Sequence, residues 1–280
     1  MSRLFCFGLG YSADGLAARL RAAGWSVAGT TRSAAKRDAL AARGIEAFAF
    51  DGRAPLPDRA LAGATHVLVS VPPEASGDVV LRQHAADFRH AKWIGYLSTT
   101  GVYGDHGGAW VDERTPPSPQ SPRSHWRAAA EAAWLATGLP VEVFRLAGIY
   151  GPGRSQFDDL RAGRARRIVK AGHLFSRIHV DDIAGVLEAS MLRPHAGAVY
   201  NVCDDEPAAS AEVVEFAASL LGVAPPPPIA LEQAELSPMA ASFWADNKRV
   251  RNDRMKRDLE FSLLYPTYRE GLRAVLEAGG

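Results

Sequence analysis

The segment LFCFGLGYSADGLAARL (residues 4–20) joins a short apolar run to an alanine- and arginine-rich stretch through small residues. Gly8, Gly10 and Ala13 form the pattern GxGxxA at this first expected strand–helix junction. In such a pattern the first glycine allows a tight turn, the second lets the backbone approach a pyrophosphate, and the third small residue lets the helix pack closely on the sheet. The N–H groups that begin the helix are free to bind the anion. The segment therefore predicts a dinucleotide-binding site, and the alternative is an ordinary glycine turn.

Short apolar runs alternate with helical stretches over the first two hundred residues. The runs are nearly continuous in apolar character, as in strands buried on both faces, and they span residues 4–8, 25–30, 46–50, 66–71, 92–98, 141–147 and 198–203. Helices are expected between them, at about 12–23, 33–43, 76–90, 122–137 and 182–192. This alternation predicts an α/β fold with a Rossmann-like, doubly wound parallel sheet of about seven strands.

The pattern loosens after residue 150, where 152–178 and 204–246 are richer in Gly, Pro and Arg. Two further helices are expected near 247–259 and 266–278. We therefore predict two parts: a nucleotide-binding domain made of 1–149 plus 179–203, and a small substrate-binding lobe made of 150–178 plus 204–280.

Composition narrows the classes of function. The chain of 280 residues is 47% hydrophobic and carries a net charge of +1, which suits a globular protein and argues against a nucleic-acid partner. Cys6 and Cys203 lie in apolar runs, as expected for free thiols in a reducing compartment, and no CxxC or HExxH pattern indicates a metal site. The N-terminus is apolar for only a few residues and no run approaches ~20, so we expect no signal peptide, no membrane span and a cytoplasmic protein.

The end of the second expected strand lacks the acid that is typical of NAD sites. An Asp or Glu there holds the ribose 2′-hydroxyl, whereas this chain has Thr31, Arg32 and Ser33. A guanidinium can bind a 2′-phosphate that a carboxylate would repel, so we predict NADP in preference to NAD. The alternative is the solvated start of a helix. Asp51, at the end of the third strand, is expected to accept a hydrogen bond from adenine, unless it only forms a turn before Gly52.

Four further segments resemble the extended short-chain dehydrogenase/reductase (SDR) family, also called the NAD-dependent epimerase/dehydratase superfamily. They are LSTTGVYGD (97–105), FRLAGIYGPGR (144–154), SRIHVDDIA (176–184) and NVCDDEP (201–207). The resemblance covers nearly the whole chain, and the closing YPTYREGL (265–272) fits a divergent subgroup. It implies an NAD(P)-binding oxidoreductase or epimerase that acts, as a monomer or homodimer, on a carbonyl, a carbinol or a nucleotide-sugar-like small molecule.

The family's catalytic set is a Ser or Thr, a Tyr, and a Lys four residues after the Tyr. The resemblance places Thr99 at the first position, Arg123 at the Tyr and Arg127 at the Lys, with Glu131 at an acidic position one turn later. A guanidinium with a pKa above ~12 does not exchange protons near neutral pH, and losing a general acid typically lowers a rate by ~10²–10⁴. Arg127 could still bind the cofactor ribose, and Arg123 a substrate phosphate. The chain is thus either an enzyme with an altered site or a catalytically inactive NADP(H)- or nucleotide-binding sensor.

The residues alone allow a plainer interpretation of the same helix. Arg123, Arg127 and Glu131 recur every four residues, so they could pair along a solvent face, after a cap at Ser121. Without the resemblance, this interpretation is the simpler one.

Two tyrosines lie in loops expected to border the nicotinamide. Tyr103 is a candidate catalytic residue and Tyr150 a candidate substrate contact, because either phenol could replace the lost acid; packing within a loop is the alternative. Arg177 is a further candidate substrate contact, while the basic run 161–170 is expected to be solvated. The remaining residues expected at the cofactor are Tyr11, Ser12, Ser70, Val71, Pro72 and Gly148.

Overall fold

The structure is a computed structural model that describes residues 2–279, and it divides into two compact units. Unit 1 comprises 2–99, Pro122–Arg145 and Ile183–Tyr200, and unit 2 comprises Thr100–Ser121, Leu146–Asp182 and 201–279. These units differ from the predicted domains mainly at residues 100–121, which belong to unit 2.

A sheet of seven strands organises unit 1. The strands are β1 (Arg3–Phe7), β2 (Ser26–Thr31), β3 (Glu46–Ala49), β4 (His66–Val69), β5 (Trp93–Thr99), β7 (Val141–Leu146) and β11 (Val199–Val202). Their order is β11-β7-β5-β4-β1-β2-β3, and the pairs among β1 to β5 are parallel. The chain order reverses between β1 and β4, which is where ligands bind at the carboxyl edge of such sheets. The predicted doubly wound α/β fold is confirmed.

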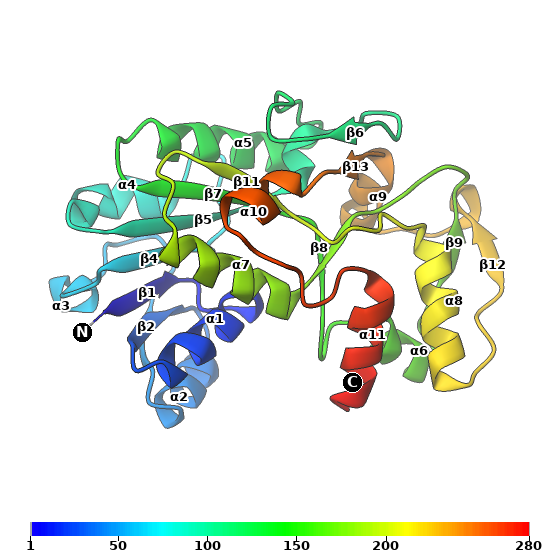
Figure 1. The fold of residues 1–280 in the computed structure, drawn as a ribbon, viewed down its shortest axis with the longest axis horizontal. Helices are drawn as coiled ribbons and strands as arrows, with labels where there is room; N and C mark the ends of the chain where they lie inside the picture. Colours follow the sequence, from blue (N-terminus) through cyan, green and yellow to red (C-terminus); the bar gives the residue numbers. More distant parts are fainter. Residues whose placement is uncertain (1, 280) are drawn as a thin grey trace. The chain divides into compact units, whose positions relative to one another are not determined.

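Helices cover both faces of this sheet (Figure 1). They are α1 (Tyr11–Ala22), α2 (Ala34–Ala42), α3 (Asp58–Leu61), α4 (Val79–His84), the 3-10 turn η1 (Ala85–Phe88), α5 (Pro122–Leu135) and α7 (Val180–Leu192). On one face, Gly15 of α1 lies so close to Ala184 of α7 that an added Cβ would stand 3.2 Å from the alanine Cβ. The helix expected at 76–90 is shorter than predicted, because α4 gives way to η1.

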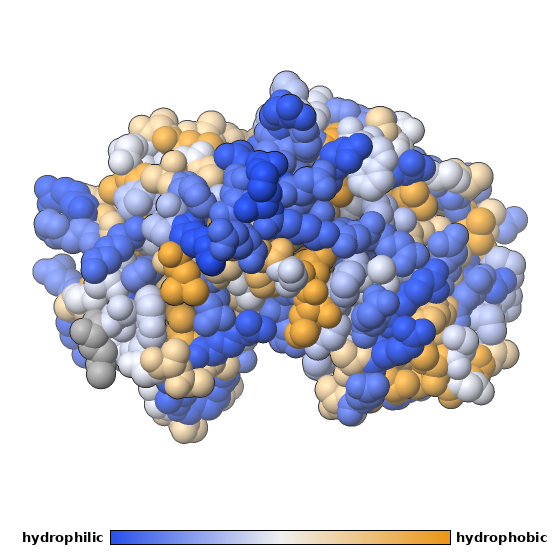
Figure 2. Space-filling view, in the orientation of Figure 1, coloured by the Kyte–Doolittle hydropathy of each residue, from blue (hydrophilic) through white to orange (hydrophobic). Residues whose placement is uncertain are grey.

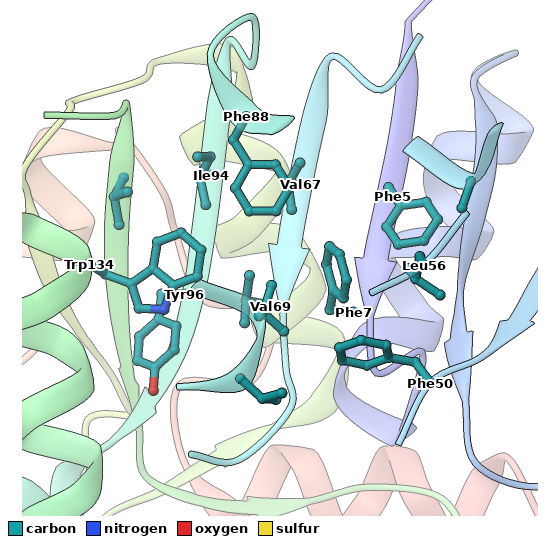
Figure 3. Close-up of a cluster of buried hydrophobic side chains, with 14 of the residues drawn as sticks. Phe5, Phe7, Phe50, Leu56, Val67, Val69, Phe88, Ile94, Tyr96 and Trp134 are labelled. Carbon is teal, nitrogen blue, oxygen red and sulfur yellow. The ribbon is translucent and has the colours of Figure 1, made fainter. Parts of the chain in front are cut away.

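The core between the sheet and α4 and α5 is rich in aromatic rings (Figure 3). Phe7 meets Phe88 edge-on at 5.9 Å between ring centroids, and Phe88 stacks on Trp134 of α5 at 6.0 Å. Tyr96 of β5 lies 6.0 Å from the same indole. Each fully buried side chain of this size contributes roughly 1.5–3 kcal/mol, so this cluster fixes α5 against β5.

Unit 2 is built from short elements. Its helices are η2 (Thr100–Tyr103), α6 (Gln156–Arg161), α8 (Ser210–Leu221), η3 (Leu231–Gln233), α9 (Pro238–Ala245), α10 (Asp253–Asp258) and α11 (Tyr268–Glu277). Its strands β6 (Trp110–Val111), β8 (Gly148–Tyr150), β9 (Arg167–Val169), β10 (Arg177–His179), β12 (Pro228–Ala230) and β13 (Arg249–Val250) pair as β10-β8, β12-β9 and β13-β6. A separate apolar core joins α6, α8 and α11 through Phe157, Val213 and Leu272.

One prediction for this region was wrong, and one helix was missed. Residues 247–259 form β13 and the short α10 rather than one helix. Helix α8 was not predicted, although Val213, Val214, Ala217 and Ala218 are buried at helical spacing and Gly222 ends it in the left-handed conformation (φ 68°). The Gly- and Pro-rich composition of the flanking residues obscured this helical spacing.

Two features of the described residues bear on a membrane or metal role, the length and apolar character of the helices and the grouping of potential metal ligands. Among residues 2–279, none of the helices combines the length and apolar character that crossing a bilayer requires. The described side chains likewise bring no three His, Cys, Asp or Glu residues into a metal-binding group. Hydrophilic residues cover most of the face seen in Figure 2, and hydrophobic ones form small separate patches.

Candidate functional site

The glycine loop of unit 1 has the geometry of an anion site. Gly8 has φ +82°, and a Cβ there would stand 3.2 Å from the Val71 side chain, so only glycine fits without strain. Gly10 caps α1 with no side-chain hydrogen bond, and the nearest atom to a Cβ added there, the Gly8 carbonyl oxygen, would be 3.8 Å away. Ala13 is fully buried beneath the helix. Backbone N–H groups at this helix start are therefore accessible to a phosphate.

Thr30 holds this loop against the second strand and was not predicted. Its hydroxyl accepts a hydrogen bond from the Gly8 N–H at 2.8 Å, and its carbonyl accepts one from the Leu9 N–H at 2.9 Å. The only signal in the sequence was a threonine at the end of the strand, next to the predicted Thr31. The predicted contacts Tyr11 and Ser12 begin α1, where both are half-buried.

Of the residues after β2, Ser33 caps helix α2 and Arg32 is exposed to solvent. The Ser33 hydroxyl accepts from the Lys36 N–H at 3.3 Å and caps α2, and the Thr31 hydroxyl accepts from the Ser33 N–H at 3.3 Å. Arg32 between them is exposed. The Arg32 charge after β2 is thus open to solvent, whereas the Ser33 hydroxyl is used as the cap of α2.

The segment after β4 lies against the glycine loop. The Ser70 N–H donates to the Phe7 carbonyl at 2.8 Å, so the β1–β4 pairing carries Val71, and Pro72 after it, alongside Gly8.

Asp51 forms a turn after β3. An oxygen of the Asp51 carboxylate accepts from the Arg53 N–H at 3.0 Å. This is the turn role that the sequence left open.

Arg127, at the family's Lys position, points at the carboxyl end of β5. Its Nη1 donates to the Leu97 carbonyl at 2.9 Å and to the Tyr96 hydroxyl at 3.1 Å. The guanidinium carbon lies 5.6 Å from the centre of the Tyr96 ring, within range of a cation–π contact. Burial raises the pKa of the Tyr96 phenol, and this buried group is a partner for Arg127 rather than a proton donor to a ligand.

Glu131, one turn later, is part of a buried ion pair. Arg145 of β7 donates to its carboxylate from Nε and from Nη2, the latter at 2.7 Å, and Ser98 donates its hydroxyl. The Glu131 and Arg145 residues are only 3% and 5% exposed. The solvent-face interpretation is therefore wrong for Arg127 and Glu131, whereas Arg123 is exposed.

We call Arg127, Glu131 and Arg145 the β5 clamp. Together they bind Tyr96, Leu97 and Ser98, which directly precede Thr99, the last residue of the strand. Thr99 is half-buried at the strand end. Thr99 thus follows three successive residues that are each hydrogen-bonded to the clamp, Leu97 through its backbone carbonyl and Tyr96 and Ser98 through their hydroxyls. A group that acts on a reacting atom needs such support from its surroundings.

The two loop tyrosines of unit 2 are packed. Tyr103 is 0% exposed and donates its hydroxyl to the Asn201 side-chain carbonyl at 2.7 Å. Tyr150 is 8% exposed, burial raises its pKa, and its hydroxyl lies against Gly271, where a Cβ would approach it to 1.9 Å. Both match the packing alternative, so we do not assign the lost acid to either of them.

Arg177 and Gly148 belong to one short sheet. They pair in register between β10 and β8, and the Gly148 N–H donates to the Ser176 carbonyl at 3.1 Å. The Arg177 guanidinium donates to the Phe175 and Ala208 carbonyls at 2.8 and 3.0 Å. These bonds give Arg177 a structural role in unit 2, which was not evident from its sequence context.

Known proteins resemble the chain over most of its length, although no protein-family model matches it. Protein YeeZ of Escherichia coli (strain K12) is 30% identical over 243 residues, which are 81% of this chain and 86% of YeeZ. The solved structure of a conserved protein of unknown function from Silicibacter pomeroyi is 50% identical, with a TM-score of 0.93 and 99% of each chain covered. The structure of dTDP-glucose 4,6-dehydratase from Bacillus anthracis in complex with NAD is 18% identical, with a TM-score of 0.79 over 99% of this chain and 96% of that one, and shows the shared fold.

The structural neighbours of the chain are extended SDR proteins, among them a putative NAD-dependent epimerase/dehydratase from Methylobacillus flagellatus that is 25% identical, with a TM-score of 0.75 over 99% of this chain and 98% of that one. The resemblance inferred from the segments around Thr99, Arg145 and Arg177 is thereby confirmed. Within the extended SDR fold, the glycine loop and the carboxyl end of β5 occur in unit 1 with the predicted local order. On α5, Arg123 is exposed and Arg127 lies within the clamp.

Proposed function

We propose that the protein is an NADP(H)-dependent oxidoreductase of the extended SDR type, acting on a carbonyl, carbinol or nucleotide-sugar-like substrate. The observation that carries the proposal is the glycine loop, where Gly8 adopts a conformation that other residues avoid and α1 begins without a side-chain cap. A loop with these two features is better suited to binding a phosphate than to reversing the direction of the chain alone. The NAD held by the Bacillus anthracis dehydratase supports a nicotinamide dinucleotide as the cofactor.

Arg32 supports NADP over NAD. It is exposed at the end of β2, where no carboxylate competes for the ribose, and a guanidinium pairs well with a 2′-phosphate. Among the residues that were expected there, Arg32 carries this preference, because the hydroxyls of Thr31 and Ser33 are engaged in local hydrogen bonds.

The proposed reaction is hydride transfer, in which the bound cofactor supplies or accepts the hydride. In the reducing direction, the Thr99 hydroxyl donates a hydrogen bond to the carbonyl oxygen as negative charge develops there. The proton that completes the carbinol comes from water, since the Arg127 guanidinium is bound to the Leu97 carbonyl and a guanidinium is a poor general acid. Arg123, exposed on the first turn of α5, binds a phosphate of the substrate where one is present.

The experiment is a paired measurement of binding and turnover. NADPH binding is followed by its own fluorescence, and NADPH oxidation is followed with sugar nucleotides and small carbonyl compounds. Turnover that falls at least tenfold in Thr99→Ala with unchanged NADPH binding would support the proposal. Absence of NADPH binding would overturn it.

A second function has one specific observation in its favour. Both arginines of α5 are poor proton donors, and Tyr103 and Tyr150 are packed. A protein that binds NADP(H) without chemistry, as a sensor, would show these features too. Tight NADPH binding without oxidation on any compound of the panel would favour the sensor.

A further inference from the structure

Four buried side chains of unit 2 carry polar atoms that have no hydrogen-bond partner among residues 2–279. The atoms are the Tyr150 and Tyr268 hydroxyls, Nε2 of His179 and both carboxylate oxygens of Asp204. Each of the four residues is at most 8% exposed, so bulk solvent does not supply the partner. Buried polar atoms are nearly always hydrogen-bonded, to protein or to ordered water, because leaving one unpaired is costly. These five atoms therefore point to a partner other than protein.

Three of the side chains come together at the sheet formed by β8 and β10. Tyr150 and His179 are register partners in this sheet, and their rings lie 5.2 Å apart between centroids. Asp204 is attached to the same sheet, because its N–H donates to the Arg177 carbonyl of β10 at 2.7 Å. The N–H groups of Arg177 and Glu206 also lie near the Asp204 carboxylate, but outside hydrogen-bond geometry.

Helix α11 brings the fourth side chain to the same place. The helix packs against β10, and the Tyr150 hydroxyl occupies the space over Gly271 that a larger side chain would fill. Tyr268 lies three residues before Gly271 and so shares its face of the helix. Burial lowers the pKa of the Arg177 guanidinium. Asp204, Tyr268 and Tyr150 oppose this shift, so all three are within electrostatic reach of one guanidinium.

The hydrogen-bonding types of the five atoms suit water. The Asp181 N–H donates to Nδ1 of His179 at 3.2 Å, so Nε2 carries the ring proton of the neutral imidazole and is a donor. The two phenols are donors as well, and the Asp204 carboxylate oxygens are acceptors. Water accepts hydrogen bonds and also donates them, so it can join these donors to the carboxylate. A metal cation accepts no hydrogen bond, and a small inorganic anion donates none to a carboxylate.

We propose that unit 2 binds ordered water at the junction of β8, β10 and α11, and that this water bridges the Asp204 carboxyl to the Tyr150 hydroxyl. Tyr268 and His179 supply further donors to the same site. The bridge joins the segment after β11 to the β8–β10 sheet and to α11. Tyr150, whose loop suggested chemistry, is then a water ligand inside unit 2. The inference is independent of the cofactor and of the proposed reaction.

The first test is a crystal structure of the native protein at a resolution that shows ordered water. A density peak is expected at about 2.5–3.2 Å from an Asp204 oxygen and from at least one of the three donors. The absence of such a peak, or direct hydrogen bonds between the side chains in its place, overturns the inference. So does a peak held by six or more oxygen atoms at about 2.0–2.6 Å, because that is the geometry of a bound cation.

The second test measures the Tyr150 hydroxyl in solution by denaturant unfolding. If the hydroxyl is bonded to water, Tyr150→Phe should lower the folding equilibrium constant by roughly threefold to tenfold. If it has no partner, removing it should leave the constant unchanged or raise it, and either result overturns the inference. Tyr200→Phe is the matched control, since the Tyr200 hydroxyl is paired directly with Nδ1 of His195 at 3.1 Å, and it should show a loss of similar size.

Discussion

A buried ion pair of unit 1 and a buried carboxyl of unit 2 hold their charges under different conditions. In unit 1, Glu131 and Arg145 share hydrogen bonds at 2.7–3.2 Å, so each buried charge has its opposite within contact. In unit 2, Asp204 is 1% exposed, and burial raises its pKa well above the usual range although Arg177 acts in the opposite direction. A buried ion pair holds its two side chains in place, whereas a buried carboxyl without a close cation makes the free energy of unfolding depend on pH.

The largest effect is expected from breaking the ion pair of unit 1. Glu131→Ala leaves Arg145 buried without its carboxylate, which should lower the free energy of unfolding by about 3–5 kcal/mol. Denaturant unfolding measures this, with Glu188→Ala as control, because the Arg19–Glu188 pair is about a third exposed and is worth at most about 1 kcal/mol. Similar losses in the two variants would show that the buried pair contributes no more than a surface pair.

Restoring the family's Tyr and Lys on α5 should raise the rate of the proposed reaction. The expected change in activation free energy is similar in size to the loss of unfolding free energy predicted for Glu131→Ala. Arg123→Tyr together with Arg127→Lys places a phenol and an ammonium one turn apart on α5, and the lysine can still reach the Leu97 carbonyl. A general acid is worth about 10²–10⁴ in rate, so NADPH oxidation with an activated carbonyl should rise toward that factor. Arg127→Lys alone is the control and should give no gain. A double variant that binds NADPH normally and gains nothing would place residue 123 away from the reacting oxygen.

The cofactor preference of unit 1 should depend on one exposed charge. Arg32→Ala removes the proposed partner of the 2′-phosphate, so NADPH affinity should fall roughly ten- to a hundredfold and NADH affinity should change little. Fluorescence titration with both cofactors measures the ratio, and Arg37→Ala, one turn into α2, is a control for general charge. Equal weakening of NADPH and NADH would mean that Arg32 does not select the cofactor.

The smallest effect is expected from Asp204 in unit 2. Its pKa is raised on folding, so the folded state holds the proton more tightly, and stability falls as pH rises from the unfolded value of about 4 through the folded pKa. Asp204→Asn removes this loss and should make the variant more stable than the native protein at pH 7 to 8, with the difference vanishing below pH 4. Thermal melts at several pH values measure it, with Asp253→Asn, whose side chain is 71% exposed, as control. A difference that stays constant across the pH range would contradict a raised pKa for Asp204.

Much of unit 1 could be predicted, because its signals are local. The strands and the Gly8–Gly10 loop follow from apolar runs and from conformations open only to glycine. The β5 clamp could not be predicted in full, since the partners of Arg127 are a backbone carbonyl and a phenol 30 and 31 residues away. In unit 2, Tyr103 and Tyr150 occupy loops that suggest chemistry, and only their packing against Asn201 and Gly271 shows otherwise.

The β5 clamp also has a consequence for the order in which the protein is made. The glycine loop gains its Thr30 support from β2 and its Val71 contact from the segment after β4, so both are available before β5 has been made. The hydroxyl of Ser98 meets its acceptor 33 residues later, and that acceptor is neutralised only when Arg145, another 14 residues on, has been synthesised and has joined the sheet. A nascent chain therefore acquires the contacts of the glycine loop before the fixed end of β5. Truncated chains ending before β7 would lack the Glu131–Arg145 ion pair and should be the forms most exposed to proteolysis.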